Sequence, residues 1–190
     1  MQYKIPLGRL CVLSILSVLL LSCATTNSGW LERYSSNDLA NPPPAFNSNY
    51  SMRIPDRITT NESVVVVDPR VHVWGAYSAN GDLEKAGIAS AGSDYCRDLG
   101  RRCHTRVGTF RVFSLGGPGC ISHIFPIPRG GAPMPYCMYF NTGQALHGVP
   151  DYEVGEGNFS HGCVRLRVID AEWLRYNFVH IGTKVIIQPY

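Results

Sequence analysis

The stretch of sequence that decides the fold is residues 64–74, which read Val64-Val65-Val66-Val67-Asp68-Pro69-Arg70-Val71-His72-Val73-Trp74. The β-branched run predicts a buried strand, because valine side chains pack well on a pleated surface and lose freedom in a helix. The Asp-Pro-Arg segment predicts a turn, because proline fixes φ and cannot donate to a strand ladder. Extended patterning then resumes, so we expect two successive strands at the start of a compact domain.

The rest of this region predicts a mainly β domain. Asn80-Gly81 is typical of a type I′ hairpin turn. One helix is expected from Ala171 to about His180, with Asp170 capping its start and Gly182 just beyond its end. We therefore predict a β-sandwich or partly closed barrel with one helix near its C-terminal end. The further expected strands lie at residues 108–113, 138–140, 144–149 and 184–188.

The N-terminal residues 1–22 are predicted to be a signal peptide. Lys4 and Arg9 form a positive start, and the apolar run from Leu10 to Leu21 is shorter than the roughly 20 residues of a membrane span. The run ends in Leu20-Leu21-Ser22-Cys23, which resembles the lipobox of bacterial lipoproteins. This resemblance implies lipidation of Cys23 and a periplasmic, lipid-anchored protein. An ordinary signal peptide with an incidental cysteine is the alternative.

The residue after the lipobox indicates the membrane in which the lipid anchor would lie. Position 24 is Ala, whereas Asp there often retains bacterial lipoproteins in the inner membrane. The likeness to lipoproteins therefore implies the outer membrane of a Gram-negative host. Residues 23–61 are polar and contain Pro42-Pro43-Pro44, so we expect a tether that leads to a compact domain at residues 62–190.

Composition sets limits on the partners of the chain. Hydrophobic residues make up 45% of the sequence, which is enough for a packed core. The formal charge is only +3, and no basic run is interleaved with aromatic residues. A nucleic-acid partner is therefore not expected.

The seven cysteines predict two disulfides and one free thiol. Cys11 leaves with the signal peptide and Cys23 is the expected lipid site, so an odd number remains in an oxidising compartment. The economical pairs are Cys96–Cys103 and Cys120–Cys137, each of which closes a local loop, although the sequence does not fix the connectivity. Cys96 and Cys103 are too far apart in sequence for a typical zinc hairpin, so no metal is expected.

The free thiol lies in the most informative segment, Ser160-His161-Gly162-Cys163-Val164-Arg165-Leu166. A cysteine nucleophile needs a base and donors for a developing oxyanion. His161 and His147 are candidate bases, and the N–H groups of Gly162 and Cys163 are candidate donors. Arg165 is a candidate carboxylate ligand. The alternative is a buried thiol beside an imidazole that only completes the fold.

The segment from Ser160 to Leu166 resembles the SHGC-hydrophobe-Arg signature of the L,D-transpeptidase (YkuD-type) family. His147-Gly148 resembles the HG element of that family, at a spacing found in many members. The resemblance covers residues 62–190. Its other parts are TRVGTF at 105–110, similar to a TPxGxF turn with Arg106 in place of proline, MPYCMYF at 134–140, similar to an MPYxMxF strand, and the closing helix and strand around 171–174 and 182–185.

The resemblance implies acyl transfer on peptidoglycan stem peptides by a β-rich domain without a cofactor. The family nucleophile corresponds to Cys163 and the base to His147, whose imidazole the Gly148 carbonyl would orient. Cys163 would attack the bond after the third residue of a tetrapeptide stem and release D-alanine. The N–H groups of Gly162 and Cys163 would stabilise the oxyanion. An amine on another stem, or on a protein to be attached to the wall, would then accept the acyl group.

The remaining motif residues have expected roles in binding substrate. Arg165 is expected to meet the stem carboxylates, with a salt bridge inside the fold as the alternative. His161 is expected to shape the donor pocket, or to be purely structural. Ser160 is expected to bond the turn backbone beside the pocket, and Tyr139 to line the donor groove.

The sequence is also compatible with two other functions. Water in place of the amine would make the chain an L,D-carboxypeptidase or a hydrolase of wall cross-links, with the same residues. A non-catalytic wall-binding lipoprotein is the second alternative. The presence of Cys163, His147, Gly162 and Arg165 together favours an enzyme, because a retired enzyme would be expected to lose at least one of them.

Overall fold

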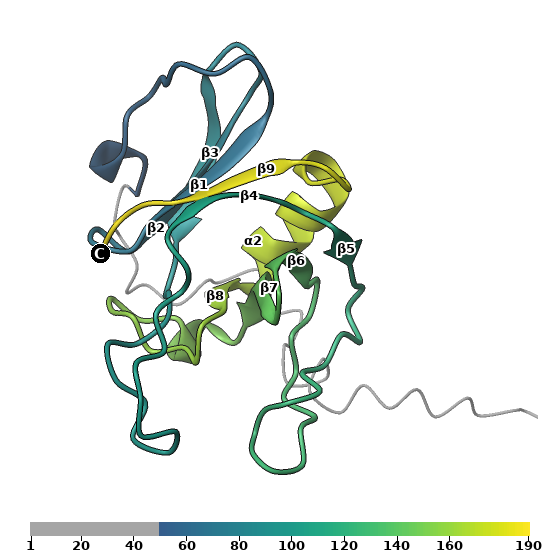
Figure 1. Cartoon of the computed structure of the whole chain (residues 1–190). Coiled ribbons are helices and arrows are strands. Elements are labelled where there is room, and N and C mark those ends of the chain that lie inside the picture. Colours follow the sequence, from purple (N-terminus) through teal and green to yellow (C-terminus); the bar gives the residue numbers. More distant parts are fainter. Residues whose placement is uncertain (1–49) are drawn as a thin grey trace, which may run out of the picture. The chain divides into compact units, whose positions relative to one another are not determined.

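The fold is described from a computed structural model, in which residues 50–190 are described (Figure 1). The predicted signal peptide, the predicted lipidation site Cys23 and the predicted tether up to residue 49 lie outside the described residues. No helix within residues 50–190 is both long and apolar enough to cross a membrane.

A five-stranded sheet is built around the valine run. This run forms β1 (Val64–Asp68), which pairs antiparallel with β2 (Val73–Tyr77) and parallel with β9 (Lys184–Ile187). The order is β3-β2-β1-β9-β4, where β3 is Leu83–Ile88 and β4 is Gly108–Arg111 (Figure 1). The central position of β1 explains its sequence, because a strand with neighbours on both sides favours β-branched residues that pack on a pleated surface.

The hairpin between β2 and β3 forms where it was predicted, but its turn differs. Gly81 has a φ of 86°, whereas Asn80 has no positive φ. A type I′ turn needs positive φ at both central residues. Five residues separate the two strands, so the longer loop does not need the I′ geometry.

A second sheet carries the motif residues. It contains β5 (Ser114–Leu115), β6 (Met138–Asn141), β7 (Gln144–Val149) and β8 (Val164–Arg167), in that order, with β7 and β8 parallel. The domain is therefore mainly β, as predicted, with two mixed sheets and no closed barrel. The predicted strand at 108–113 is shorter in the structure, where it ends at Arg111. After it the Val112 N–H bonds to Thr183 and the Phe113 N–H bonds to Tyr139 of β6, so the chain passes there from the first sheet to the second.

The main hydrophobic core lies between the two sheets and α2. Its buried side chains come from both sheets and from the helix, and include Trp74, which is fully buried. A smaller apolar cluster lies at one side and contains Tyr50 from the short 3-10 helix η1 (Tyr50–Arg53). That helix falls within the stretch expected to be a tether. It packs there because Tyr50 and Ile54 bury apolar surface against β2 and β3.

The predicted helix begins earlier than expected and ends differently. α2 covers Val168–Trp173, directly after β8, and continues as a π-helical turn, η3 (Leu174–Phe178). Asp170 is not the N-cap; its carboxylate is buried inside the first turn. It pairs there with Arg167 at 2.8 Å and Lys85 at 3.5 Å. The two cations explain why an acid lies at this buried position, since an isolated carboxylate would be costly.

Both predicted disulfides are present in the structure. They join Cys96 to Cys103 and Cys120 to Cys137, and Cys163 is the free cysteine among residues 50–190. Each disulfide closes a loop without regular strands.

Replacing Asp170 by Asn should lower the free energy of unfolding by about 3 kcal/mol, because Arg167 and Lys85 then lose a buried countercharge. Urea denaturation of the two proteins measures this difference. The matched control is Asp82→Asn, which removes an exposed pair with Arg57 and should cost less than about 1 kcal/mol. Equal losses in the two variants would contradict a special role for the buried pair.

Candidate active site

The register of β7 and β8 brings the motif residues to one face of the second sheet. His147 pairs with Arg165, and Leu146 with Val164. Alternate residues of a strand point to opposite faces, so Leu146 and Val164 face the core while His147 and Arg165 face away from it. Cys163 precedes β8 by one position and therefore shares the face of His147. The sheet thus places the nucleophile candidate and the base candidate on neighbouring strands.

The turn before Cys163 is closed by Ser160. Its hydroxyl accepts the N–H of Gly162 at 3.0 Å and donates to the carbonyl of Cys163. Gly162 has a φ of 127°, a conformation that side-chain-bearing residues rarely adopt. The Gly162 N–H is already bonded, which differs from its predicted place in an oxyanion hole. The Cys163 N–H takes part in none of the turn and loop hydrogen bonds of residues 50–190, which makes it a candidate donor for an oxyanion.

His147 is held as a neutral imidazole. Its side chain is buried, and Nδ1 lies 3.0 Å from the carbonyl oxygen of Gly148, as the family resemblance implied. This contact requires the proton on Nδ1, which leaves the lone pair on Nε2. Burial lowers the pKa of His147 to about 4, the Gly148 bond opposes this, and the Arg165 charge lowers it further. The imidazole is therefore an unprotonated base at neutral pH.

Cys163 is a thiol at the edge of solvent. It is partly exposed and packs against the apolar cluster that contains the Cys120–Cys137 disulfide. Burial raises the pKa of Cys163, while the Ala145 N–H and the Arg165 charge lower it. The Cys163 sulfur lies 3.8 Å from the carbonyl oxygen of Gly143. A thiol on the same sheet face as a neutral imidazole is suited to a nucleophile that loses its proton as it attacks.

Arg165 provides a positive charge beside both groups. Within the described part of the chain its guanidinium forms no ion pair, unlike that of Arg167, which pairs with Asp170. The alternative of a salt bridge inside the fold is therefore not seen there. A guanidinium with open donors is suited to a carboxylate, because its fork matches two oxygens.

His161 and Tyr139 take up different positions. The Nε2 atom of His161 lies 2.8 Å from the carboxylate of Asp98, and its ring lies 4.6 Å from that of Phe125. His161 therefore joins the two disulfide-closed loops, which favours a structural or pocket-shaping role over that of base. Tyr139 packs against the same apolar cluster as Cys163, and burial, together with the Cys163 charge, raises the pKa of Tyr139.

One group of side chains resembles a metal site without being one. Ligand atoms of Cys96, Asp98 and His161 lie within 4.8 Å of one another. Cys96 is bonded to Cys103, so its sulfur is not a thiolate ligand. Two ligands remain, and these are already paired with each other.

Several residues around the turn were missed by the sequence analysis. Thr105, Gln144 and Tyr190 hydrogen-bond the turn or the segment beside it. Each contact joins positions far apart in sequence. No local pattern reveals such contacts, although Thr105 lies in the segment already noted at 105–110.

Comparison with a family model establishes the family of the chain. The model of the L,D-transpeptidase catalytic domain, YkuD, matches residues 62–187. The chain belongs to this family. Among proteins of curated function, none matches it.

Solved L,D-transpeptidase structures share the fold. An L,D-transpeptidase from Xylanimonas cellulosilytica is 25% identical, with a TM-score of 0.59, over 70% of this chain and 64% of that one. An L,D-transpeptidase from Mycobacterium tuberculosis is 27% identical, with a TM-score of 0.55, over 67% of this chain and 57% of the other. The chain thus spans less than two thirds of the length of these structures.

The free thiol gives a direct test of the cysteine assignment. Iodoacetamide added to the native chain should label Cys163, because the other cysteines of residues 50–190 are in disulfides. Peptide mass spectrometry locates the label, and Cys163→Ala should leave this region unlabelled. Label on Cys96 or Cys120 in the native protein would contradict the pairing.

The buried imidazole predicts a pH dependence of stability. The unfolded chain binds a proton at His147 near pH 6.5 and the folded chain only near pH 4. Between these values the unfolded state holds more protons, so stability falls as pH falls, by about 3 kcal/mol in total. The full stability is present above pH 6.5. Urea denaturation at several pH values in this range measures the free energy of unfolding. This free energy should depend less on pH in His147→Gln than in the wild-type chain. An equal pH dependence in the two proteins would contradict the lowered pKa of His147.

Proposed function

We propose that this member of the family is a peptidoglycan L,D-transpeptidase with Cys163 as nucleophile and His147 as general base. The observation that carries the proposal is that His147 on β7, Arg165 on β8 and Cys163 directly before β8 share one face of the sheet. Family membership supports the reaction class.

The first half of the reaction forms a thioester. The sulfur of Cys163 attacks the carbonyl carbon of the third residue of a tetrapeptide stem, and its proton passes to Nε2 of His147. The imidazolium is stabilised by its Nδ1–H bond to Gly148. When the C–N bond breaks, the same proton goes to the amine of D-alanine, which leaves. His147 returns to its neutral state, the one that burial favours.

The second half transfers the acyl group. An amine from another stem attacks the thioester, gives its proton to His147, and the Cys163 sulfur leaves and is reprotonated. The oxyanion of each tetrahedral intermediate forms beside the Cys163 N–H, the donor left open by the Ser160 turn. One such donor typically contributes about 3 kcal/mol to transition-state stabilisation.

Arg165 is proposed to bind a carboxylate of the stem. Its charge lies close enough to lower the pKa of both His147 and Cys163. A stem carboxylate held there would place the neighbouring peptide bond at the thiol. Tyr139 is proposed to line the same groove, next to Cys163.

We also propose that the chain is a periplasmic lipoprotein, anchored through Cys23 and facing peptidoglycan from the outer membrane. The support for this is the lipobox-like sequence at residues 20–23 and the alanine after it. Wall-attached proteins are then within reach as acceptors. Metabolic labelling with a fatty acid, lost in Cys23→Ala, tests the anchor.

Incubation of the chain with disaccharide-tetrapeptide tests the reaction. Mass spectrometry should find free D-alanine and dimers joined through third-position residues. Cys163→Ala should abolish both, because it removes the nucleophile, and His147→Gln should slow both by at least about a hundredfold.

The controls separate the alternatives. Arg165→Gln should raise KM by about tenfold, as expected for the loss of one charged hydrogen-bonding partner. The exposed Arg57→Gln should leave KM unchanged. D-alanine without dimers would indicate hydrolysis or the need for a protein acceptor. No product from a folded chain with both disulfides would refute catalysis and leave a wall-binding role.

A further inference from the structure

The turn that carries Cys163 is supported from behind by a buried hydroxyl. Oγ1 of Thr105 donates to the carbonyl of Gly162 at 2.9 Å, with a longer contact of 3.3 Å to the carbonyl of Cys163. The same oxygen accepts the N–H of Gly92 at 2.9 Å. Thr105 is fully buried, so water does not compete for these bonds. A single side chain thus links Gly92 to the peptide that joins Gly162 and Cys163.

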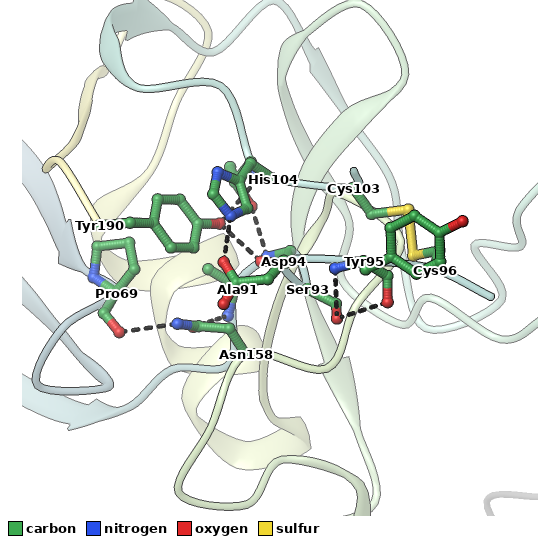
Figure 2. Close-up of polar contacts among 12 residues, drawn as sticks. Pro69, Ala91, Ser93, Asp94, Tyr95, Cys96, Cys103, His104, Asn158 and Tyr190 are labelled. Atoms are coloured by element: carbon green, nitrogen blue, oxygen red, sulfur yellow. Dashed lines mark hydrogen bonds and ion pairs between the residues drawn. A yellow bond between two sulfur atoms is a disulfide. The ribbon is translucent and has the colours of Figure 1, made fainter. Parts of the chain in front are cut away.

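Tyr190 bonds to both Thr105 and Gly92. Its phenol oxygen accepts the N–H of Thr105 at 2.9 Å and donates to the carbonyl of Gly92 at 2.9 Å. Burial raises the pKa of Tyr190, so the hydroxyl keeps the proton that it donates. The Tyr190 ring also stacks on the imidazole of His104, with centroids 3.9 Å apart, and Figure 2 shows this imidazole facing Asp94.

The segment around Thr105 is fixed from its other side by β7. The side chain of Gln144 accepts the N–H of Arg106 at 3.1 Å and donates to the carbonyl of His104 at 3.3 Å. Gln144 begins the strand that carries His147. Thr105 is therefore clamped between Tyr190 and the strand of the base.

Thr105, held in this way, fixes the direction of the Cys163 N–H, which takes part in the proposed reaction. A trans peptide is planar, so its C=O and N–H point in opposite directions. A hydroxyl that holds the Gly162 carbonyl therefore aims the Cys163 N–H away from Thr105. This N–H is the oxyanion donor of the proposed reaction. The Gly162 N–H is bonded to Ser160 and does not replace it.

We propose that Tyr190 is a positioning residue for acyl transfer, which acts through Thr105 to fix the orientation of the Gly162–Cys163 peptide. This inference rests on the proposed function. Tyr190 does not touch the reacting atoms, so its effect is confined to steps that develop an oxyanion. Alkylation of the thiol by iodoacetamide develops none, and it therefore serves as an internal reference.

The test measures two rates on the full chain with Tyr190→Phe, which keeps the ring on His104 and removes the hydroxyl. D-alanine release from disaccharide-tetrapeptide should fall about tenfold in kcat with KM unchanged, as for a small misplacement of a catalytic group. Iodoacetamide labelling of the Cys163 peptide, followed from neutral to alkaline pH, should keep its rate and its pH profile. Thr105→Val should lower kcat at least as much, and Thr105→Ser should restore it.

The control variant is Tyr152→Phe, which removes the hydroxyl of a tyrosine that is 83% exposed and should change neither rate. An active wild-type chain with unaltered kcat in Tyr190→Phe would overturn the positioning role. Equal loss of both rates, with a lower melting temperature, would show a merely structural role and would also overturn it. A wild-type chain that is alkylated at Cys163 yet releases no D-alanine would instead overturn the proposed function, and the positioning role with it.

Discussion

The parallel pairing of β7 with β8 is the constraint on which the site depends. Parallel neighbours cannot be joined by a tight turn and need a long crossover. Here the crossover is residues 150–163, and its last residue is Cys163. The thiol therefore reaches the sheet at the end of an irregular segment, while His147 lies within a regular strand. The ladder fixes the position of His147, the proposed base, whereas Cys163, the proposed nucleophile, must be fixed by other contacts.

Cys163 is held in place by hydrogen bonds to the backbone of the crossover and of β8. Ser160 closes the turn from inside, and Ser90 pairs with Arg165 on the open side of β8. Thr105 supports the Gly162 carbonyl from a third direction. Each of these hydroxyls or backbone groups is buried, and an unpaired buried group would be costly. The geometry of the nucleophile is thus tied to the stability of the domain.

The sequence predicts those features that come from local chemistry. The valine run predicts β1 because branched side chains favour strands, and the short cysteine spacings predict the two disulfides. The start of α2 could not be predicted, because Asp170 resembles an N-cap until its partner Lys85 is known to lie beside it. The hydrogen bonds that support the turn before Cys163 were also not predicted. The bond from Thr105 to Gly162 spans 57 positions, and that from Tyr190 to Gly92 spans 98, so only the folded chain reveals them.

The two histidines of the motif show how burial divides their roles. His147 is buried, bonds a backbone carbonyl and has a lowered pKa, all of which preserve a neutral base. His161 is partly exposed and faces a carboxylate and an aromatic ring on separate loops. The printed contacts of the His161 side chain are with Asp98 in one disulfide-closed loop and Phe125 in the other, so they join the two loops. Residue identity alone leaves both histidines as candidate bases, whereas their surroundings favour His147 as the proposed base and make His161 a link between the two disulfide-closed loops.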